Sequence, residues 1–125
     1  MARIRFDDLT PEQYIFLQEN GELNGCGPKT KWIPIPDWIF TTNCDHHDFN
    51  YWLGHNEADR LKADYQFYES MWENADSLPW YKRWAAKSMA WTYYQFVKLL
   101  GKPLFHYADE ERTLEDLEEL MNASE

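Results

Sequence analysis

The sequence is poor in positive charge. Its 12 lysine and arginine residues stand against 22 aspartate and glutamate residues, which gives a formal net charge of −10. Nucleic-acid phosphates are bound through clustered basic residues, so this balance argues against a nucleic-acid partner. It also argues against strong electrostatic attraction to an anionic membrane. The sequence has no run of about 18 apolar residues, the length at which a helix can span a bilayer, and we expect no transmembrane segment.

Cysteine is scarce as well. Cys26 and Cys44 are the two cysteines of the chain, so at most one disulfide can form within it. The opening residues, MARIRFDDLTPEQ, contain no apolar segment of the kind found in secretory signals. Because the cytosol is reducing, the missing signal lowers the expectation of a disulfide.

Apolar and aromatic residues are abundant instead. They make up 44% and 18% of the 125 residues, which is enough to bury a core in one domain covering residues 1–125. No segment alternates between apolar and polar residues like a strand for more than a few positions. The expected fold class is therefore all-α.

Capping residues mark the expected helices. Thr10, Pro11 and Gln13 form an N-terminal capping pattern, and Gly54 and Gly101 mark helix ends. The segment GELNGCGPKTKWIPIP is rich in glycine and proline and predicts a long loop after the N-terminal helix. The expected helices cover residues 11–19, a segment from a cap at Asp37 to Gly54, a segment that follows Asn56, a segment from a cap near Ser77 to Gly101, and an acidic stretch after Thr113. In the fourth helix, four residues at helical spacing are most simply explained as core residues: Trp84, Trp91, Tyr94 and Val97.

A histidine and an aspartate interrupt two apolar helix faces. Helical spacing puts Phe40, Cys44, His47 and Tyr51 on one stripe of the second helix, and Leu61, Asp64, Tyr68 and Met71 on one stripe of the third. The short connection between the helices predicts an antiparallel pair. At about 1.5 Å rise per residue, His47 and Asp64 then come to the same height. A structural ion pair and a catalytic dyad both fit this geometry.

Asp48 offers a carboxylate that points elsewhere, about 100° around the helix from its neighbouring histidine. A carboxylate that faces the loop NGCGPK suggests a hard cation bound by oxygen atoms. A bridge between Cys26 and Cys44 would hold that loop against the helix and bring the carbonyls of Gly25 and Gly27 within reach of Asp48. Taken alone, the loop is better explained as a plain connection.

These residues carry a family resemblance. NGCG followed by CDHHDFNY resembles the two signatures of the secreted-type phospholipase A2 family, a Cys-Gly calcium loop and a helix with Cys, His-Asp and Tyr. The later segment ADYQFYESM is similar to the second catalytic helix of bacterial and fungal members. The resemblance covers about Asn24 to Met71. It implies an antiparallel pair of long helices that carries the active site, preceded by an N-terminal helix and a calcium loop and followed by C-terminal helices.

The resemblance implies an enzyme that hydrolyses the sn-2 acyl ester of glycerophospholipids at a membrane or micelle surface. His47 would be the general base that activates water, and Asp64 would orient and stabilise its imidazolium. Tyr51 would form a hydrogen bond with Asp64. The backbone N–H of Gly27 would contribute to an oxyanion hole.

The resemblance also implies a Ca²⁺ cofactor and one disulfide. Asp48 would supply the side-chain ligand, and the carbonyls of Gly25 and Gly27 would complete part of the metal shell. The disulfide would join Cys26 to Cys44. A family enzyme normally leaves the cell, so the missing signal implies bacterial export by another route or delivery in a viral particle, and otherwise a cytoplasmic location.

Two other classes of function stay open. Cys26, Cys44 and one of His46 or His47 could bind zinc, although a fourth ligand is not obvious. Alternatively, the same helical scaffold could be a catalytically silent module that binds lipid or protein. The segment KWIPIPDWIF fits either an aromatic rim that enters lipid headgroups or a set of side chains packed under the loop.

Overall fold

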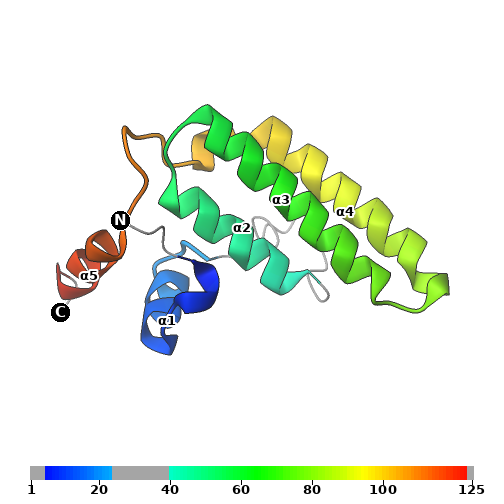
Figure 1. Ribbon diagram of the computed structural model, residues 1–125, viewed down its shortest axis with the longest axis horizontal. Helices are drawn as coiled ribbons and strands as arrows, with labels where there is room; N and C mark the ends of the chain where they lie inside the picture. Colours follow the sequence, from blue (N-terminus) through cyan, green and yellow to red (C-terminus); the bar gives the residue numbers. More distant parts are fainter. Residues whose placement is uncertain (1–4, 24–39, 124–125) are drawn as a thin grey trace.

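The computed structural model describes residues 5–23 and 40–123, and within these ranges the secondary structure is helical apart from one isolated parallel bridge between His55 and Tyr107. The elements follow one another in the order shown in Figure 1: η1 (Phe6–Asp8), α1 (Pro11–Glu19), α2 (Thr41–Leu53), α3 (Glu57–Asp76), α4 (Trp80–Leu100), η2 (Lys102–Leu104) and α5 (Leu114–Ala123). The expected all-α class is confirmed. None of the helices in the described ranges has the length and apolar character needed to cross a membrane.

Local capping explains where two helices begin. The Thr10 hydroxyl accepts a hydrogen bond from the Gln13 N–H at 3.2 Å, and the Gln13 side chain accepts one from the Thr10 N–H at 2.9 Å. The Asn56 side chain accepts a hydrogen bond from the Asp59 N–H at 3.0 Å. Each acceptor satisfies a backbone N–H that has no partner inside its helix. The expected starts of α1 and α3 are therefore confirmed.

Two other expected caps are wrong. The second helix begins at Thr41 with Phe40 as its N-cap, so it starts four residues after Asp37, which itself lies outside the described residues. Phe40 is fully buried, so core packing rather than a polar side chain fixes this helix start. Ser77 ends α3 instead of starting α4, because its hydroxyl donates to the Asn74 carbonyl at 2.6 Å.

Three helices build the centre of the molecule. The helix α3 packs against both α2 and α4, and the chain reverses direction between consecutive helices (Figure 1). Their shared core contains Phe40 just before α2, Cys44 from α2, Phe67, Met71 and Ala75 from α3, and Ala86, Ala90 and Tyr93 from α4. The helices α1 and α5 cover another face of α2, where a second core cluster contains Leu17, Leu23, Phe49, Trp52, Leu53 and Leu117. The antiparallel pairing expected for the second and third helices is present.

The outer side of α4 differs from the expectation. Trp84 is 80% exposed and Trp91 is 55% exposed, so neither belongs to the core. The buried side of α4 uses Ala86, Ala90 and Tyr93 instead. Small residues let α4 approach α3 closely, which leaves the large tryptophan rings on the opposite side of the helix.

The segment after η2 returns to the C-terminal end of α2. The His106 N–H donates to the Tyr51 carbonyl at 3.2 Å, and the Arg112 N–H donates to the Leu53 carbonyl at 2.7 Å. Gly54, the C-cap of α2, has a φ of 74°. A Cβ at this position would lie 2.0 Å from the His106 carbonyl oxygen, so the close approach requires glycine.

Candidate active site

The inner stripe of α2 brings polar groups into the protein interior. Phe40, Cys44, His47 and Tyr51 are all buried, as their spacing predicted. His47 is 5% exposed, and its ring is stacked on that of Phe67 from α3, with ring centroids 4.4 Å apart. The Tyr51 ring also contacts the imidazole, with ring centroids 4.2 Å apart. Aromatic packing on α2 and α3 therefore fixes the orientation of the histidine.

His47 and Asp64 meet across the two helices. The Nε2 atom of His47 lies 2.8 Å from Oδ1 of Asp64, and Asp64 is 1% exposed. Because an ionised carboxylate only accepts hydrogen bonds, this contact favours the tautomer with its proton on Nε2. That tautomer leaves the lone pair on Nδ1.

Tyr51 binds the same carboxylate oxygen. Its hydroxyl donates to Oδ1 of Asp64 at 2.5 Å. Burial, followed by the hydrogen bond to Asp64, raises the pKa of Tyr51 well above its usual value of 10.0. A Cβ added to Gly101 would lie 2.3 Å from the Tyr51 hydroxyl oxygen, so this glycine provides the space that the phenol occupies. The tyrosine is therefore a neutral hydrogen-bond donor held in one position.

Arg60 is a site residue that the sequence reasoning missed. It is 3% exposed, and its Nη1 donates to Oδ2 of Asp64 at 3.3 Å. Leu61, which was expected on this stripe, is 48% exposed instead. The signal was present in the i, i+4 spacing of Arg60 and Asp64, a spacing that places two residues on one helix face. It was missed because hydrophobicity assigns a leucine, rather than an arginine, to the inside.

A second carboxylate continues the network outward. Arg60 Nη2 lies 2.6 Å from Oε1 of Glu57, and the Tyr107 hydroxyl donates to the other oxygen of Glu57. The hydrogen bond from Arg60, which has the larger effect, and the one from Tyr107 lower the pKa of Glu57 to about 2. The Glu57 carboxylate in turn raises the pKa of Arg60. The guanidinium therefore stays charged between two acids, and it balances the buried charge of Asp64.

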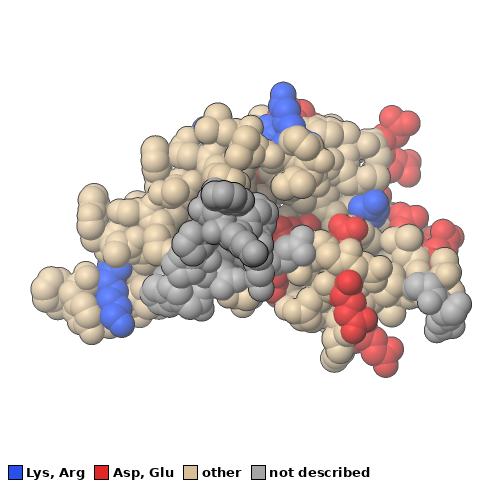
Figure 2. All heavy atoms as spheres, turned by 180° about the vertical axis from the view of Figure 1, so that it is seen from behind, with Lys and Arg blue, Asp and Glu red and all other residues tan. Residues whose placement is uncertain are grey.

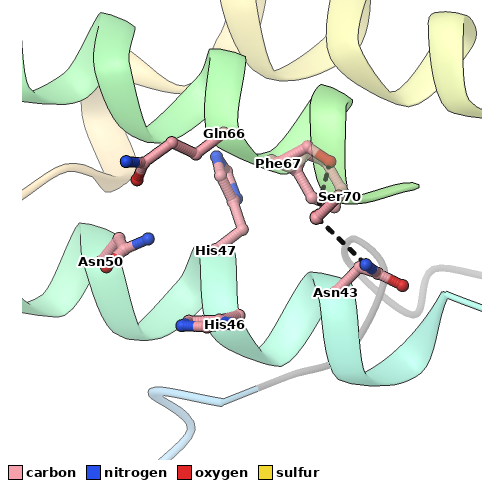
Figure 3. Close-up of a pocket in the computed structure, with 7 residues that line it drawn as sticks. All are labelled: Asn43, His46, His47, Asn50, Gln66, Phe67 and Ser70. Carbon is pink, nitrogen blue, oxygen red and sulfur yellow. Dashed lines mark hydrogen bonds between the residues drawn. The ribbon is translucent and has the colours of Figure 1, made fainter. Parts of the chain in front are cut away.

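A pocket of about 250 Å³ opens beside the imidazole, between α2 and α3. The His47 ring extends from α2 toward α3 between the two α3 side chains Gln66 and Phe67 (Figure 3). At the far end of the pocket, the Asn43 side chain donates to the Ser70 hydroxyl at 3.0 Å. The lining residues are Asn43, His46, His47, Asn50, Gln66, Phe67 and Ser70. The pocket therefore gives a small molecule access to one side of a histidine that is otherwise buried.

The expected calcium ligands are described only in part. Asp48 is half-buried on α2, directly after His47. Its carboxylate is the oxygen donor that a hard cation prefers. The other expected ligands, Gly25 and Gly27, lie outside the described residues. Within residues 5–23 and 40–123, no group of three or more His, Cys, Asp or Glu side chains is placed to hold a metal ion. The donor type fits calcium, and the binding itself stays a prediction.

The zinc alternative is not favoured by the described residues. The Nε2 of His47 is occupied by Asp64, and Cys44 lies among the apolar side chains of the core. His46 points to the other side of α2, where its ring packs against Phe6 with centroids 4.8 Å apart. The two histidines and Cys44 therefore do not share one centre. The expected disulfide partner, Cys26, lies outside the described residues, so the pairing stays a prediction.

A buried histidine held against a carboxylate, at the edge of a pocket between two antiparallel helices, is an arrangement suited to a hydrolase that activates water. The family described as prokaryotic phospholipase A2 matches residues 22–101, which is more than half of the chain, and the protein belongs to this family. Family membership makes it a lipolytic hydrolase of the phospholipase A2 type. The match extends beyond the stretch that carried the resemblance and includes all of α4. No curated protein and no solved structure gives a significant match.

Proposed function

We propose that the protein hydrolyses the sn-2 acyl ester of glycerophospholipids in a calcium-dependent reaction, with His47 and Asp64 activating the attacking water. The observation that carries the proposal is the 2.8 Å contact between His47 Nε2 and Asp64 Oδ1 beside a pocket, in a member of the phospholipase A2 family. The pocket supplies the access that a substrate and a water molecule need.

The proton path follows from the tautomer. His47 holds a proton on Nε2 toward Asp64, and its Nδ1 lone pair takes a proton from the water that attacks the ester carbonyl carbon. The imidazolium then carries two protons, and the Asp64 carboxylate stabilises its charge. When the ester C–O bond breaks, Nδ1 returns the proton to the leaving lysophospholipid oxygen. The products are a fatty acid and a lysophospholipid, and the histidine is regenerated.

Tyr51 and Arg60 hold the carboxylate in place for this step. Tyr51 donates to the oxygen that also faces His47, and Arg60 donates to the other oxygen. With both oxygens engaged, Asp64 cannot rotate away from the imidazole. These two residues act through Asp64, so we assign them as positioning residues.

The calcium ligands proposed for this chain are the Asp48 carboxylate and the carbonyls of Gly25 and Gly27. When bound, calcium would supply positive charge that holds the substrate phosphate and polarises the ester carbonyl. The Gly27 N–H is proposed to donate to the same carbonyl oxygen. The half-buried position of Asp48 beside His47 supports this assignment.

The test is release of sn-2 fatty acid from phospholipid vesicles, measured as initial rate per folded molecule. We expect His47→Gln to lose about 10²–10⁴-fold in rate, the usual contribution of a general base. His55 supplies a control, because its side chain pairs with Asp59 outside the pocket, and His55→Gln should stay near wild type. Asp48→Asn and excess chelator should each abolish activity, because an amide lacks the charge that binds a divalent cation. Retention of more than about a tenth of the rate by His47→Gln would refute the proposed base.

A further inference from the structure

The segment that follows η2 lies against the turn between α2 and α3 (Figure 1). The His106 N–H donates to the Tyr51 carbonyl at 3.2 Å, and the His106 carbonyl accepts from the His55 N–H at 2.9 Å. We name residues 105–112 the C-terminal clamp. They lie outside residues 22–101, which match the family. Family membership therefore says nothing of what the clamp does.

The first residue of the clamp reaches the support of one Asp64 oxygen. Phe105 is 6% exposed, and its ring meets that of Tyr51 edge to face, with centroids 5.2 Å apart. Ala63 of α3 completes this small buried cluster. The Tyr51 hydroxyl donates to Oδ1 of Asp64, the oxygen that also faces His47. Because an edge-to-face pair favours one arrangement of its rings, Phe105 limits the movement of the phenol.

A second residue of the clamp reaches the support of the other oxygen. The Tyr107 hydroxyl donates to Oε2 of Glu57, whose Oε1 lies 2.6 Å from Nη2 of Arg60. Nη1 of Arg60 donates in turn to Oδ2 of Asp64 at 3.3 Å. The Tyr107 ring also packs on Phe105, with centroids 4.9 Å apart. One short segment therefore stands behind both oxygens of Asp64.

Charge does not hold the clamp in place. Figure 2 shows acidic side chains over the half of the molecule that carries α1 and α5, and the clamp leads into α5. The clamp contains Asp109, Glu110 and Glu111, and the first turn of α3 contains Glu57 and Asp59. Like charges gathered in one region repel one another. The clamp therefore depends on its hydrogen bonds and ring contacts, and loss of one of them should alter the site.

We propose that Phe105 and Tyr107 are positioning residues of the His47–Asp64 dyad. General-base catalysis needs the imidazole in one orientation, and a misplacement of about 1 Å can cost about 10²-fold in rate. With the clamp in place, Tyr51 and Arg60 are held against Asp64, and the carboxylate keeps the imidazole aligned. This assignment rests on the proposed function.

The first measurement is the initial rate on a short-chain phospholipid dispersed as monomers, at saturating calcium and per folded molecule. Tyr107→Phe keeps the ring on Phe105 and removes the hydroxyl, and Phe105→Leu keeps an apolar side chain and removes the edge-to-face contact. Coupling within one network is worth about 2- to 150-fold, and each residue acts through others, so we expect each variant to lower kcat about threefold to tenfold. KM should stay within about twofold, because the lost alignment matters in the transition state.

Double variants test the two routes. If Tyr107 acts through Glu57, Tyr107→Phe should have no further effect in a Glu57→Gln protein and its full effect in a Tyr51→Phe protein. If Phe105 acts through Tyr51, Phe105→Leu should have no further effect on kcat in a Tyr51→Phe protein and its full effect in a Glu57→Gln protein. Residues that only support the fold would show their full effect in both backgrounds.

Matched controls come from exposed positions. Tyr81 at the start of α4 is 64% exposed, and Leu104, the neighbour of Phe105, is 73% exposed. Tyr81→Phe and Leu104→Ala should keep kcat within about twofold of wild type. The melting temperature of every variant is measured, so that a loss of folded protein is not counted as a loss of rate.

A second measurement needs no substrate. In protein labelled with ¹⁵N-histidine, the Nε2 proton of His47 is followed by NMR and assigned by its loss in His47→Gln. We expect its exchange with water to be about threefold to tenfold faster in Tyr107→Phe and in Phe105→Leu, because Asp64 then holds it less firmly.

The outcomes separate the clamp from the proposed reaction. Faster exchange in both variants of a protein that hydrolyses no phospholipid would uphold the clamp and defeat the proposed enzymatic function. An active protein in which both variants keep the wild-type kcat and the wild-type exchange would overturn the clamp. So would variants that change the melting temperature alone or KM alone, a lower kcat without faster exchange, or full effects of Tyr107→Phe in the Glu57→Gln protein.

Discussion

Removal of Arg60 should damage both stability and the site. The guanidinium is 3% exposed and is the only donor that any described residue offers to Oδ2 of Asp64. Breaking a buried ion pair by removing one partner costs about 3–5 kcal/mol, because the remaining charge is left uncompensated. Asp64 keeps hydrogen bonds from His47 and Tyr51, so we expect Arg60→Met to lower the free energy of unfolding by about 3 kcal/mol, at the lower end of this range. For a domain of this size, that loss corresponds to a decrease of about 10–15 °C in Tm.

Urea denaturation and thermal melting measure the loss, and initial rate per folded molecule separates it from catalysis. We expect the rate to fall as well, since Asp64 is then free to rotate. Arg60→Lys should be intermediate, because an ammonium keeps the charge but lacks the planar fork that reaches two carboxylates. Glu57→Gln is the control: it removes the outer, partly exposed partner and should cost much less. An Arg60→Met protein with unchanged unfolding free energy and unchanged rate would show that the reasoning is wrong.

Three further predictions concern Tyr51, Gly101 and the cysteines. The pKa of Tyr51 is raised in the folded state, so as pH rises the unfolded state loses the tyrosine proton first. The contribution of Tyr51 to the free energy of unfolding is therefore fully present below pH 10.0 and should decrease above it, by up to about 1.4 kcal/mol per pH unit. This decrease should occur in wild type and be absent in Tyr51→Phe. Equal pH dependence of the two proteins in denaturant titrations would contradict this. Gly101→Ala should lower both Tm and activity, because its Cβ would meet the Tyr51 hydroxyl; a variant as active as wild type would disprove the tight fit. Mass spectrometry of oxidised protein should show Cys26 joined to Cys44, a bridge that closes a loop of about 18 residues and contributes about 3 kcal/mol, and two free thiols would count against it.

Local signals in the sequence predicted much of the helical framework. Thr10 and Asn56 each accept a hydrogen bond from a backbone N–H of their own helix, so the helix starts that they mark do not depend on distant residues. Gly54 and Gly101 also mark helix ends correctly, although the need for glycine at both positions comes from His106 and Tyr51, about fifty residues away in the sequence. The cap at Asp37 was wrong because core packing of a neighbouring aromatic residue decides where α2 begins.

The meeting of His47 and Asp64 was also predictable, because helical rise and a short turn are enough to align them. Arg60 was not, since its burial depends on two acids that neutralise it and on the depth to which α3 packs. The outward orientation of Trp84 and Trp91 was missed for a related reason. Spacing shows that residues share a face, but it does not show which face turns inward.

The hydrogen bonds between the end of α2 and the segment after η2 have a consequence for the order of folding. The carbonyls of Tyr51 and Leu53 are satisfied by the N–H groups of His106 and Arg112, more than fifty residues later in the chain. During synthesis, α2 and α3 can leave the ribosome and begin to pair while these carbonyls still face water. Contacts so distant in sequence form late, because a long loop must first close. The active site of a nascent chain should therefore become stably folded only after the residues around Arg112 have emerged from the ribosome. Protease protection of stalled chains of increasing length would test this order.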